Sequence, residues 1–317
     1  MEKPMTLMMI LYIIAIIYRD TRTNSVEISS WYKEVSHDQI SRMLQSKCHW
    51  PTLLWQVFAQ KLVGDMTGGY LIIDDTVLEK YGRKIFGVSW VYSSSLKKAL
   101  EGINIVMILW TNGVVRVPLG IRIWVKGKHS KIVLASKMLR WAKHIGFKPS
   151  YVLFDSWYAS KKFLKQIKGY GWKFVTRLKS NRKFAGKQLR KHWPYRFGHG
   201  YGNISGSIEV LVVKDGSRFL ASNDITLSIQ DVKLKYSCRQ QIEETFKILK
   251  FQLAWGKNPS YSQQAQFAHL HLCLMAFCCL DAESAATGLT PYSIRRSLFP
   301  EAVPKQSYLI QYFTLAA

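Results

Sequence analysis

Residues 69–75 have the sequence GYLIIDD, and this stretch decides how the rest of the chain is interpreted. Both of its faces are apolar until the two aspartates appear, which is typical of a strand buried between two layers. A second short run, YVLFD at 151–155, has the same pattern and also ends in an aspartate. In open sheets covered by helices, sites form outside the carboxyl ends of the strands. An aspartate after one strand is often only a turn or capping residue, but two strands that end alike favour a shared site.

The segments around these strands predict a mixed sheet flanked by helices, which is an α/β fold. Residues 103–110 and 114–125 have the pattern of two strands joined at Asn112-Gly113, a strong hairpin signal. Residues 130–146 show helical periodicity, and residues 160–171 predict a helix closed by glycine.

Four regions follow from this pattern. Residues 1–65 are expected to form a small helical N-terminal region, because SHDQISRML has the capping box of a helix start. This region is a candidate DNA-binding module, and the alternative is a helix that packs on the next domain. Residues 66–171 hold the first part of the α/β domain. Residues 172–232 are too long for a simple connection and predict a β-rich insertion. Residues 233–317 are expected to be helical and to complete the domain.

The charge of the chain points to a polyanion partner. It has 45 Lys and Arg against 20 Asp and Glu, a net charge of +25, and the basic residues are spread along the whole sequence. Such an excess favours a folded surface that lies against nucleic acid over an enzyme of small metabolites. The five cysteines include no CxxC pair, so neither a disulfide framework nor a strong zinc signature is present. We expect reduced thiols in the cytoplasm.

Residues 5–18, MTLMMILYIIAIIY, are almost wholly apolar. A helix that spans a membrane needs about 20 such residues, so this run is short. We predict a buried helix and no membrane partner, with a signal segment or membrane anchor as the alternatives.

The last informative stretch is YSCRQQIEETFKILK, residues 236–250. At about 100° per residue in a helix, four polar residues fall on one side: Tyr236, Arg239, Glu243 and Lys250. An apolar stripe lies directly beside them. Glu243 is therefore expected at the edge of the buried face, and Glu244 is expected in solvent.

These four residues match the Y-(2)-R-(3)-E-(6)-K signature, and the chain resembles the DDE transposases encoded by bacterial insertion sequences. LIIDDT and YVLFDSWY resemble the first and second aspartate motifs of that group, and SHDQISRML resembles its N-terminal segment. The resemblance covers about residues 36–280. It implies a ribonuclease-H-like fold, with a β-rich insertion before the glutamate.

The resemblance also implies the roles of individual residues. The metal-binding and catalytic triad would be Asp75, Asp155 and Glu243. Asp75 is chosen because it directly precedes a threonine, as the first aspartate commonly does in this group. In some relatives one residue intervenes, and that spacing selects Asp74. By the same resemblance, three residues would bind DNA phosphates near the cut: Tyr236, Arg239 and Lys250.

Carboxylates that converge on one edge repel one another unless cations neutralise them, and hard oxygen ligands suit Mg²⁺ or Mn²⁺. Two such ions can activate an attacking water or 3′-hydroxyl and stabilise the leaving oxygen. The expected activity is cleavage of insertion-sequence ends and strand transfer into target DNA. The expected partners are double-stranded DNA, as terminal inverted repeats and target, and a second copy in a homodimer. The expected location is the bacterial cytoplasm at the nucleoid. The alternative is an inactive or truncated DNA-binding relative.

Overall fold

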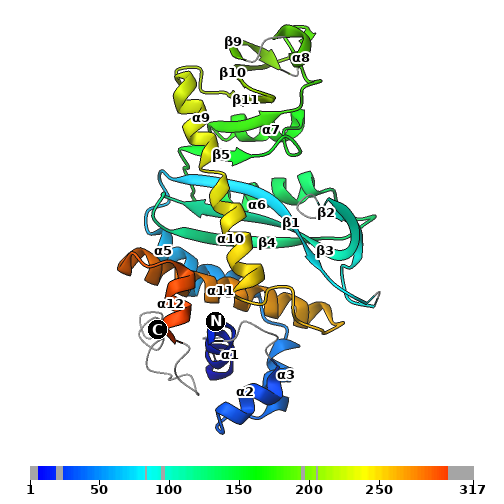
Figure 1. Ribbon diagram of the computed structural model, residues 1–317, viewed down its shortest axis with the longest axis vertical. Helices are drawn as coiled ribbons and strands as arrows, with labels where there is room; N and C mark the ends of the chain where they lie inside the picture. Colours follow the sequence, from blue (N-terminus) through cyan, green and yellow to red (C-terminus); the bar gives the residue numbers. More distant parts are fainter. Residues whose placement is uncertain are drawn as a thin grey trace.

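The computed structural model describes residues 6–18, 24–82, 84–93, 97–193, 197–204 and 206–298. The ends of the predicted N-terminal and C-terminal regions, residues 1–5 and 299–317, lie outside the described residues. Figure 1 shows an elongated molecule with the N-terminal helices at one end, a large sheet in the middle and short strands at the other end.

The strands of the described chain form one continuous sheet of eleven members. Their bounds are β1 Tyr70–Glu79, β2 Ser89–Ser93, β3 Lys98–Thr111, β4 Arg116–Trp124, β5 Tyr151–Phe154, β6 Phe174–Leu178, β7 Lys183–Phe184, β8 Lys187–Gln188, β9 Phe197–Ile204, β10 Ile208–Asp215 and β11 Arg218–Ser222.

The central strands have the order β4-β3-β1-β5-β6. β3 pairs antiparallel with β1 and β4, whereas β5 pairs parallel with β1 and β6. The predicted hairpin between β3 and β4 is confirmed. Gly113 has a φ of +96°, and the Asn112 side chain accepts hydrogen bonds from the backbone N–H groups of Val114 and Val115. The predicted mixed sheet is therefore confirmed as well.

The two aspartates of the first motif lie in the middle of β1, so the prediction that they end this strand was wrong. β1 continues past them because it pairs with β3 along its whole length. Its parallel pairing with β5 is shorter and stops where Ile73 faces Phe154. Asp74 and Asp155 directly follow this last pair. These two residues are therefore neighbours at the point where the parallel strands part.

Helices cover both faces of the central sheet. Their bounds are α6 Lys131–His144, α7 Lys161–Gly169, α8 Leu189–His192, α9 Ile229–Ser237, α10 Gln240–Phe251, α11 Gln263–Thr287 and α12 Pro291–Leu298. Ile73 of β1 belongs to the core shared with α6 and α7, whereas Ile72 belongs to the core shared with α10 and α11. Side chains alternate between faces along a strand. Asp74 therefore shares the α10 face with Ile72, and Asp75 shares the α6 face with Ile73.

The N-terminal region is a group of short helical segments, and several of them contact α11. They are α1 Leu7–Tyr18, α2 Ser25–Trp31, α3 His37–Leu44, α4 Trp50–Leu54, the π-helical turn η1 Trp55–Ala59 and α5 Gln60–Val63. The capping box of Ser36 and Gln39 is present as predicted. α3 contacts both α1 and α11. Whether this module enters a DNA groove stays a prediction.

The predicted burial of the apolar N-terminal helix is confirmed for α1. Its residues from Leu11 to Tyr18 are all buried, and the Tyr12 hydroxyl lies 3.1 Å from Nδ1 of His269 on α11. Within the described residues, α11 alone is long and apolar enough to cross a membrane, and 89% of its apolar stretch is buried inside the fold. Such burial is also found in the core helices of globular proteins.

The region of the predicted insertion holds the expected strands. β6 pairs parallel with β5, and the sheet then continues through β11, β10 and β9. The strand predicted from KFVTRLKS thus belongs to the central sheet, and the later strands extend it. The division of the chain into four regions stays a prediction.

The segment predicted as one helix from residue 236 is two helices, α9 and α10, which follow one another down the face of the sheet in Figure 1. At their junction Cys238 and Arg239 keep right-handed helical dihedral angles. However, the N–H of Arg239 bonds to the carbonyl of Tyr236, and the N–H of Ile242 bonds to the carbonyl of Arg239. These bonds span three residues and tighten the turn, as in a 3₁₀-helix. The junction turns Tyr236 further round than a regular α-helix would.

Candidate functional site

Arg239 is the centre of the charged cluster on the α10 face of the sheet. Its Nη1 donates to Oδ2 of Asp74 at 2.5 Å, and its Nη2 donates to Oε1 of Glu243. The Asp74 and Arg239 side chains are only 16% and 17% exposed. Because α10 packs directly on β1, residues 239 and 243, one helical turn apart, reach the same point of the strand. The structure thus brings Asp74, Arg239 and Glu243 together.

Asp155 lies beside this cluster. It directly follows β5, and its Oδ1 accepts the backbone N–H of Trp157 at 2.8 Å. Burial raises the pKa of Asp155, while the Trp157 N–H and the charge of Arg239 act against the rise. Arg239 therefore acts electrostatically on three carboxylates, those of Asp74, Asp155 and Glu243.

The carboxylates of the cluster lie close to one another and are poorly solvated, which shifts their pKa values. Burial raises the pKa of Asp74 to about 7; Arg239 lowers it, and the neighbouring carboxylates of Asp155 and Asp75 raise it further. Burial alone would lower the pKa of Arg239, but Asp74, Tyr236 and Glu243 outweigh burial and raise it. Arg239 is thus firmly cationic and partly neutralises the acids around it.

Asp75 is directed to the other face and has a different set of partners. Its Oδ2 accepts from Nζ of Lys131 at 2.6 Å and from the side-chain amide of Asn104 at 3.1 Å. Its Oδ1 accepts from the Tyr158 hydroxyl at 2.8 Å. Asp75 therefore has three side-chain hydrogen bonds and joins β1 to α6 and to the loop after β5. This geometry favours Asp74 over Asp75 as the partner of Glu243.

The structure places the other two signature residues at different distances from the acids. Tyr236 is next to the cluster, because the Arg239 guanidinium lies 5.8 Å from its ring centre. Lys250 is two helical turns beyond Glu243 and lines a separate hollow with Glu79, near the far end of β1. Burial lowers the pKa of Lys250. The cluster thus includes Tyr236 but not Lys250.

Glu243 and Glu244 differ in their partners more than in their exposure, since their side chains are 45% and 49% exposed. Glu243 pairs with Arg239, whereas Glu244 lies 3.6 Å from Arg116 at the start of β4. Arg116 in turn donates Nε and Nη2 to Oδ1 of the buried Asp281. Helical phase thus predicted which glutamate joins the cluster. It did not predict that Glu244 also has a cationic partner.

The sequence of residues 67–279 matches the transposase DDE domain family. The chain belongs to this family. Its fold is similar to that of the piggyBac transposase, seen by cryo-EM in a synaptic complex with hairpin DNA. The two structures superpose with a TM-score of 0.56 at 14% sequence identity, over 97% of this chain and 69% of the other. A search of curated proteins finds no match.

The fold of this DDE-family chain is therefore the predicted ribonuclease-H-like fold. In the strand order β4-β3-β1-β5-β6, Asp74 lies on β1 and Asp155 directly follows the neighbouring β5, while Glu243 comes from α10. The family match supports membership among DDE transposases, and the particular insertion-sequence group remains a prediction.

Members of the DDE family generally use divalent metal ions. Within the described residues, no three His, Cys, Asp or Glu side chains are grouped closely enough to hold a metal as they stand. The donor chemistry nevertheless fits Mg²⁺ or Mn²⁺, because Asp74, Asp155 and Glu243 offer only hard carboxylate oxygens. A cation already lies among them, since the Arg239 guanidinium bridges Asp74 and Glu243. The cluster is therefore built to hold positive charge.

Sequence analysis missed the side chains that hold Asp75 and Asp155. Lys131 directly follows the N-cap residue of α6, so the sequence predicted its position at the start of a helix. The sequence did not predict its ion pair with Asp75. Trp157 and Tyr158 stand in the quoted YVLFDSWY motif. Their contacts with the two aspartates depend on how the loop after β5 turns back.

Proposed function

We propose that this chain is a transposase that cleaves the ends of an insertion sequence and joins them to target DNA. The observation that carries the proposal is the cluster on the α10 face, where Arg239 lies among Asp74, Asp155 and Glu243. Membership of the DDE family and a net charge of +25 support the same activity.

In this proposal Asp74, Asp155 and Glu243 hold the metal ions, and Asp74 takes the place for which the sequence favoured Asp75. Asp74 is on the same face as Glu243 and next to Asp155, whereas Asp75 is bonded to Lys131 and Tyr158. Bound Mg²⁺ or Mn²⁺, as two ions, would activate a water or 3′-hydroxyl and stabilise the leaving oxygen.

The remaining residues of the signature hold the DNA. Arg239 presents a planar guanidinium that suits bidentate contact with a phosphate, and Tyr236 lies beside it. Both residues therefore meet the backbone close to the cut. Lys250 is two turns further along α10 and would contact a phosphate away from the cut. The partners are the terminal inverted repeats and the target duplex. Two ends must meet, so the active form is a homodimer, located at the nucleoid in the bacterial cytoplasm.

The test compares Glu243→Gln with Glu244→Gln on a plasmid that carries the gene and its natural flanking sequence. Wild-type protein should cut at the flanks only when Mg²⁺ or Mn²⁺ is added. Glu243→Gln should abolish the cut, because it removes a ligand charge. Glu244→Gln is the matched control and should cut at a rate within a few-fold of wild type. Cutting by Glu243→Gln at the wild-type rate would overturn the proposal.

A further inference from the structure

Strand β2 forms an exposed edge of the sheet. It stands first in the strand order, and among the described strands it pairs only with β3. In an antiparallel pair, every second residue directs its backbone N–H and C=O groups away from the partner strand. The outer side of β2 therefore presents backbone groups that a further strand can bind. In Figure 1, β2 lies beside β3 at the right of the central sheet, away from β9 and β10 at the top.

Two large aromatic side chains project from β2 into solvent. Trp90 is 65% exposed and Tyr92 is 66% exposed, and they lie on one face because they are two residues apart. Val91, between them, is buried on the other face. The neighbours on β3 are Glu101 opposite Trp90 and Ala99 opposite Tyr92. These four residues, Trp90, Tyr92, Ala99 and Glu101, are named the β2 face. Since the solvent-facing side of an antiparallel sheet is normally polar, adjacent exposed aromatic residues indicate a binding surface.

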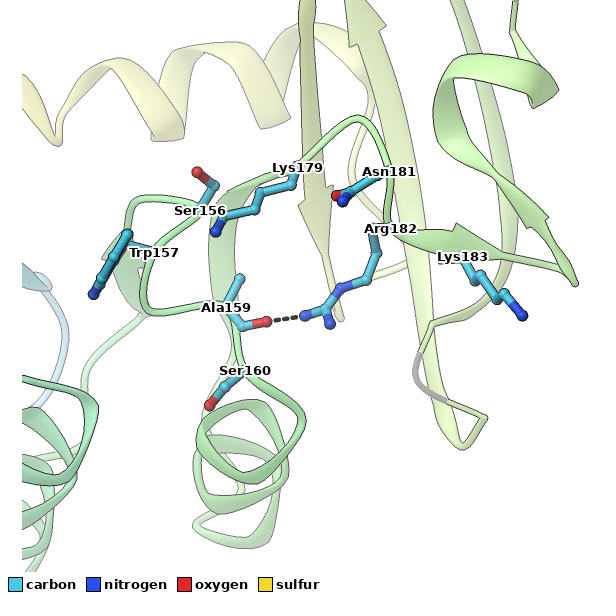
Figure 2. A pocket seen from close by; sticks show the side chains of 8 residues that line it. All are labelled: Ser156, Trp157, Ala159, Ser160, Lys179, Asn181, Arg182 and Lys183. Carbon is cyan, nitrogen blue, oxygen red and sulfur yellow. Dashed lines mark hydrogen bonds between the residues drawn. The ribbon is translucent and has the colours of Figure 1, made fainter. Parts of the chain in front are cut away.

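The charges of the β2 face favour a protein partner over DNA. In the paired residues 89–93 and 98–102, the charged side chains are Lys98 and Glu101. By alternation Lys98 belongs to the other face, so the β2 face carries a carboxylate and no cation. A surface that binds DNA phosphates needs Lys or Arg. A hollow of about 490 Å³ beside Asp155 has that composition, and Figure 2 shows the cations in its lining: Lys179, Arg182 and Lys183.

A second copy of the chain fits the β2 face. Two copies that each carry a net charge of +25 repel one another, so they approach closely only where the surface has little positive charge. Antiparallel pairing of two identical strands also places a twofold axis between them, which makes the contact self-complementary. If the axis passes through Val91, Trp90 of each copy lies opposite Tyr92 of the partner subunit. Aromatic pairs of this kind, directly across two strands, stabilise a sheet.

We propose that two copies of this chain dimerise through β2, in an antiparallel pair that joins their sheets and covers Trp90 with Tyr92 of the partner subunit. The inference rests on the proposed function for the expectation of a homodimer, and it names the surface through which that homodimer forms. β2 is five residues long, so the interface is small. A small interface gives a weak dimer, with a dissociation constant on the order of 10 µM.

The first test measures the mass of the full chain without DNA, by sedimentation at about 1 to 100 µM protein, a range that spans this dissociation constant. Wild-type protein should change from monomer to dimer. Trp90→Lys/Tyr92→Lys should weaken dimerisation at least tenfold, because it places lysine opposite lysine twice. Tyr201→Lys/Tyr292→Lys is the matched control, since it adds the same charge at two exposed aromatic positions elsewhere. It should dimerise as wild type.

The second test keeps one aromatic pair and examines the register. Trp90→Cys and Tyr92→Cys proteins are mixed and oxidised with glutathione disulfide. In the mixed dimer the two cysteines are directly opposite, with Cα atoms about 4.5–5.5 Å apart, which suits a disulfide. In either variant alone the new cysteines are diagonal, about 7–8 Å apart, and too far for a bridge. The mixture should therefore form several-fold more covalent dimer than either variant alone.

The proposal is overturned if wild-type protein stays monomeric at about 100 µM, if Trp90→Lys/Tyr92→Lys dimerises as tightly as wild type, or if the mixed cysteine variants cross-link no better than each alone. Failure of the proposed function has a different result. The wild-type protein would then dimerise and cross-link through β2 as described, but it would cut no plasmid.

Discussion

The position of Asp74 makes the stability of the protein depend on pH in a direction opposite to that of most surface aspartates. The pKa of this carboxyl rises from its ordinary 3.8 to about 7, chiefly because it is buried. Between these two values the folded protein keeps a proton that the unfolded chain releases. Stability is therefore highest at low pH in this window and falls as pH rises toward 7.

The size of the effect follows from the shift. About three pKa units at about 1.4 kcal/mol each give a loss of up to about 4 kcal/mol in the free energy of unfolding between pH 4 and pH 8. Asp155 adds a contribution of the same sign, because burial also raises its pKa. Asp74→Asn has no proton to lose, so it should remove the Asp74 part of the pH dependence.

The assay is urea unfolding at pH 5 and pH 8 in EDTA, followed by circular dichroism. Wild-type protein should be less stable at pH 8 than at pH 5. The difference should shrink by about 2–3 kcal/mol in Asp74→Asn, because about two pKa units of the shift lie between these pH values. Added Mg²⁺ should also reduce it in wild type, since a ligand of the folded state stabilises that state. Asp65→Asn, at an exposed position, is the control and should behave as wild type. Equal pH dependence in wild type and Asp74→Asn would refute the reasoning.

Two further predictions concern the DNA and Asp75. The affinity for duplex DNA should fall about a thousandfold between 50 and 200 mM salt if about six phosphates are contacted; filter binding at several salt concentrations measures this, and a flat response would contradict phosphate-dominated binding. Asp75→Asn should lower the free energy of unfolding by about 2–3 kcal/mol, because it weakens three hydrogen bonds, one of them to Lys131. Urea unfolding measures this change, and a loss below about 0.5 kcal/mol would show that Asp75 does not stabilise the fold.

Local patterns predicted most of the fold. Residues 151–154, YVLF, form a fully buried strand because they are a short apolar run between turn signals, and the Asn112-Gly113 pair fixes the hairpin. The Ser36 capping box is formed by residues only three positions apart, so nothing distant is needed to predict it. The helical periodicity predicted that Glu243 lies at the edge of the buried face, beside Arg239. This prediction holds because Arg239, at the junction, keeps helical dihedral angles.

The choice between Asp74 and Asp75 required the tertiary structure. Both faces of β1 are apolar up to these residues, so alternation gives no sign of which face α10 covers. That depends on the layers, in which Ile72 meets α10 and Ile73 meets α6. The length of β1 could not be predicted from the local sequence either, because the strand continues past Asp75 only by pairing with the distant β3.

The central claim is that Asp74, and not Asp75, is the first metal ligand, and a metal-specificity switch tests it most directly. A thiolate is a softer ligand than a carboxylate and suits Mn²⁺ better than Mg²⁺. The measurement is plasmid cleavage by Asp74→Cys and Asp75→Cys in each metal. The account predicts that Asp74→Cys is inactive in Mg²⁺ and regains activity in Mn²⁺, while Asp75→Cys shows the same metal preference as wild type. Rescue by Mn²⁺ at Asp75 alone would contradict it.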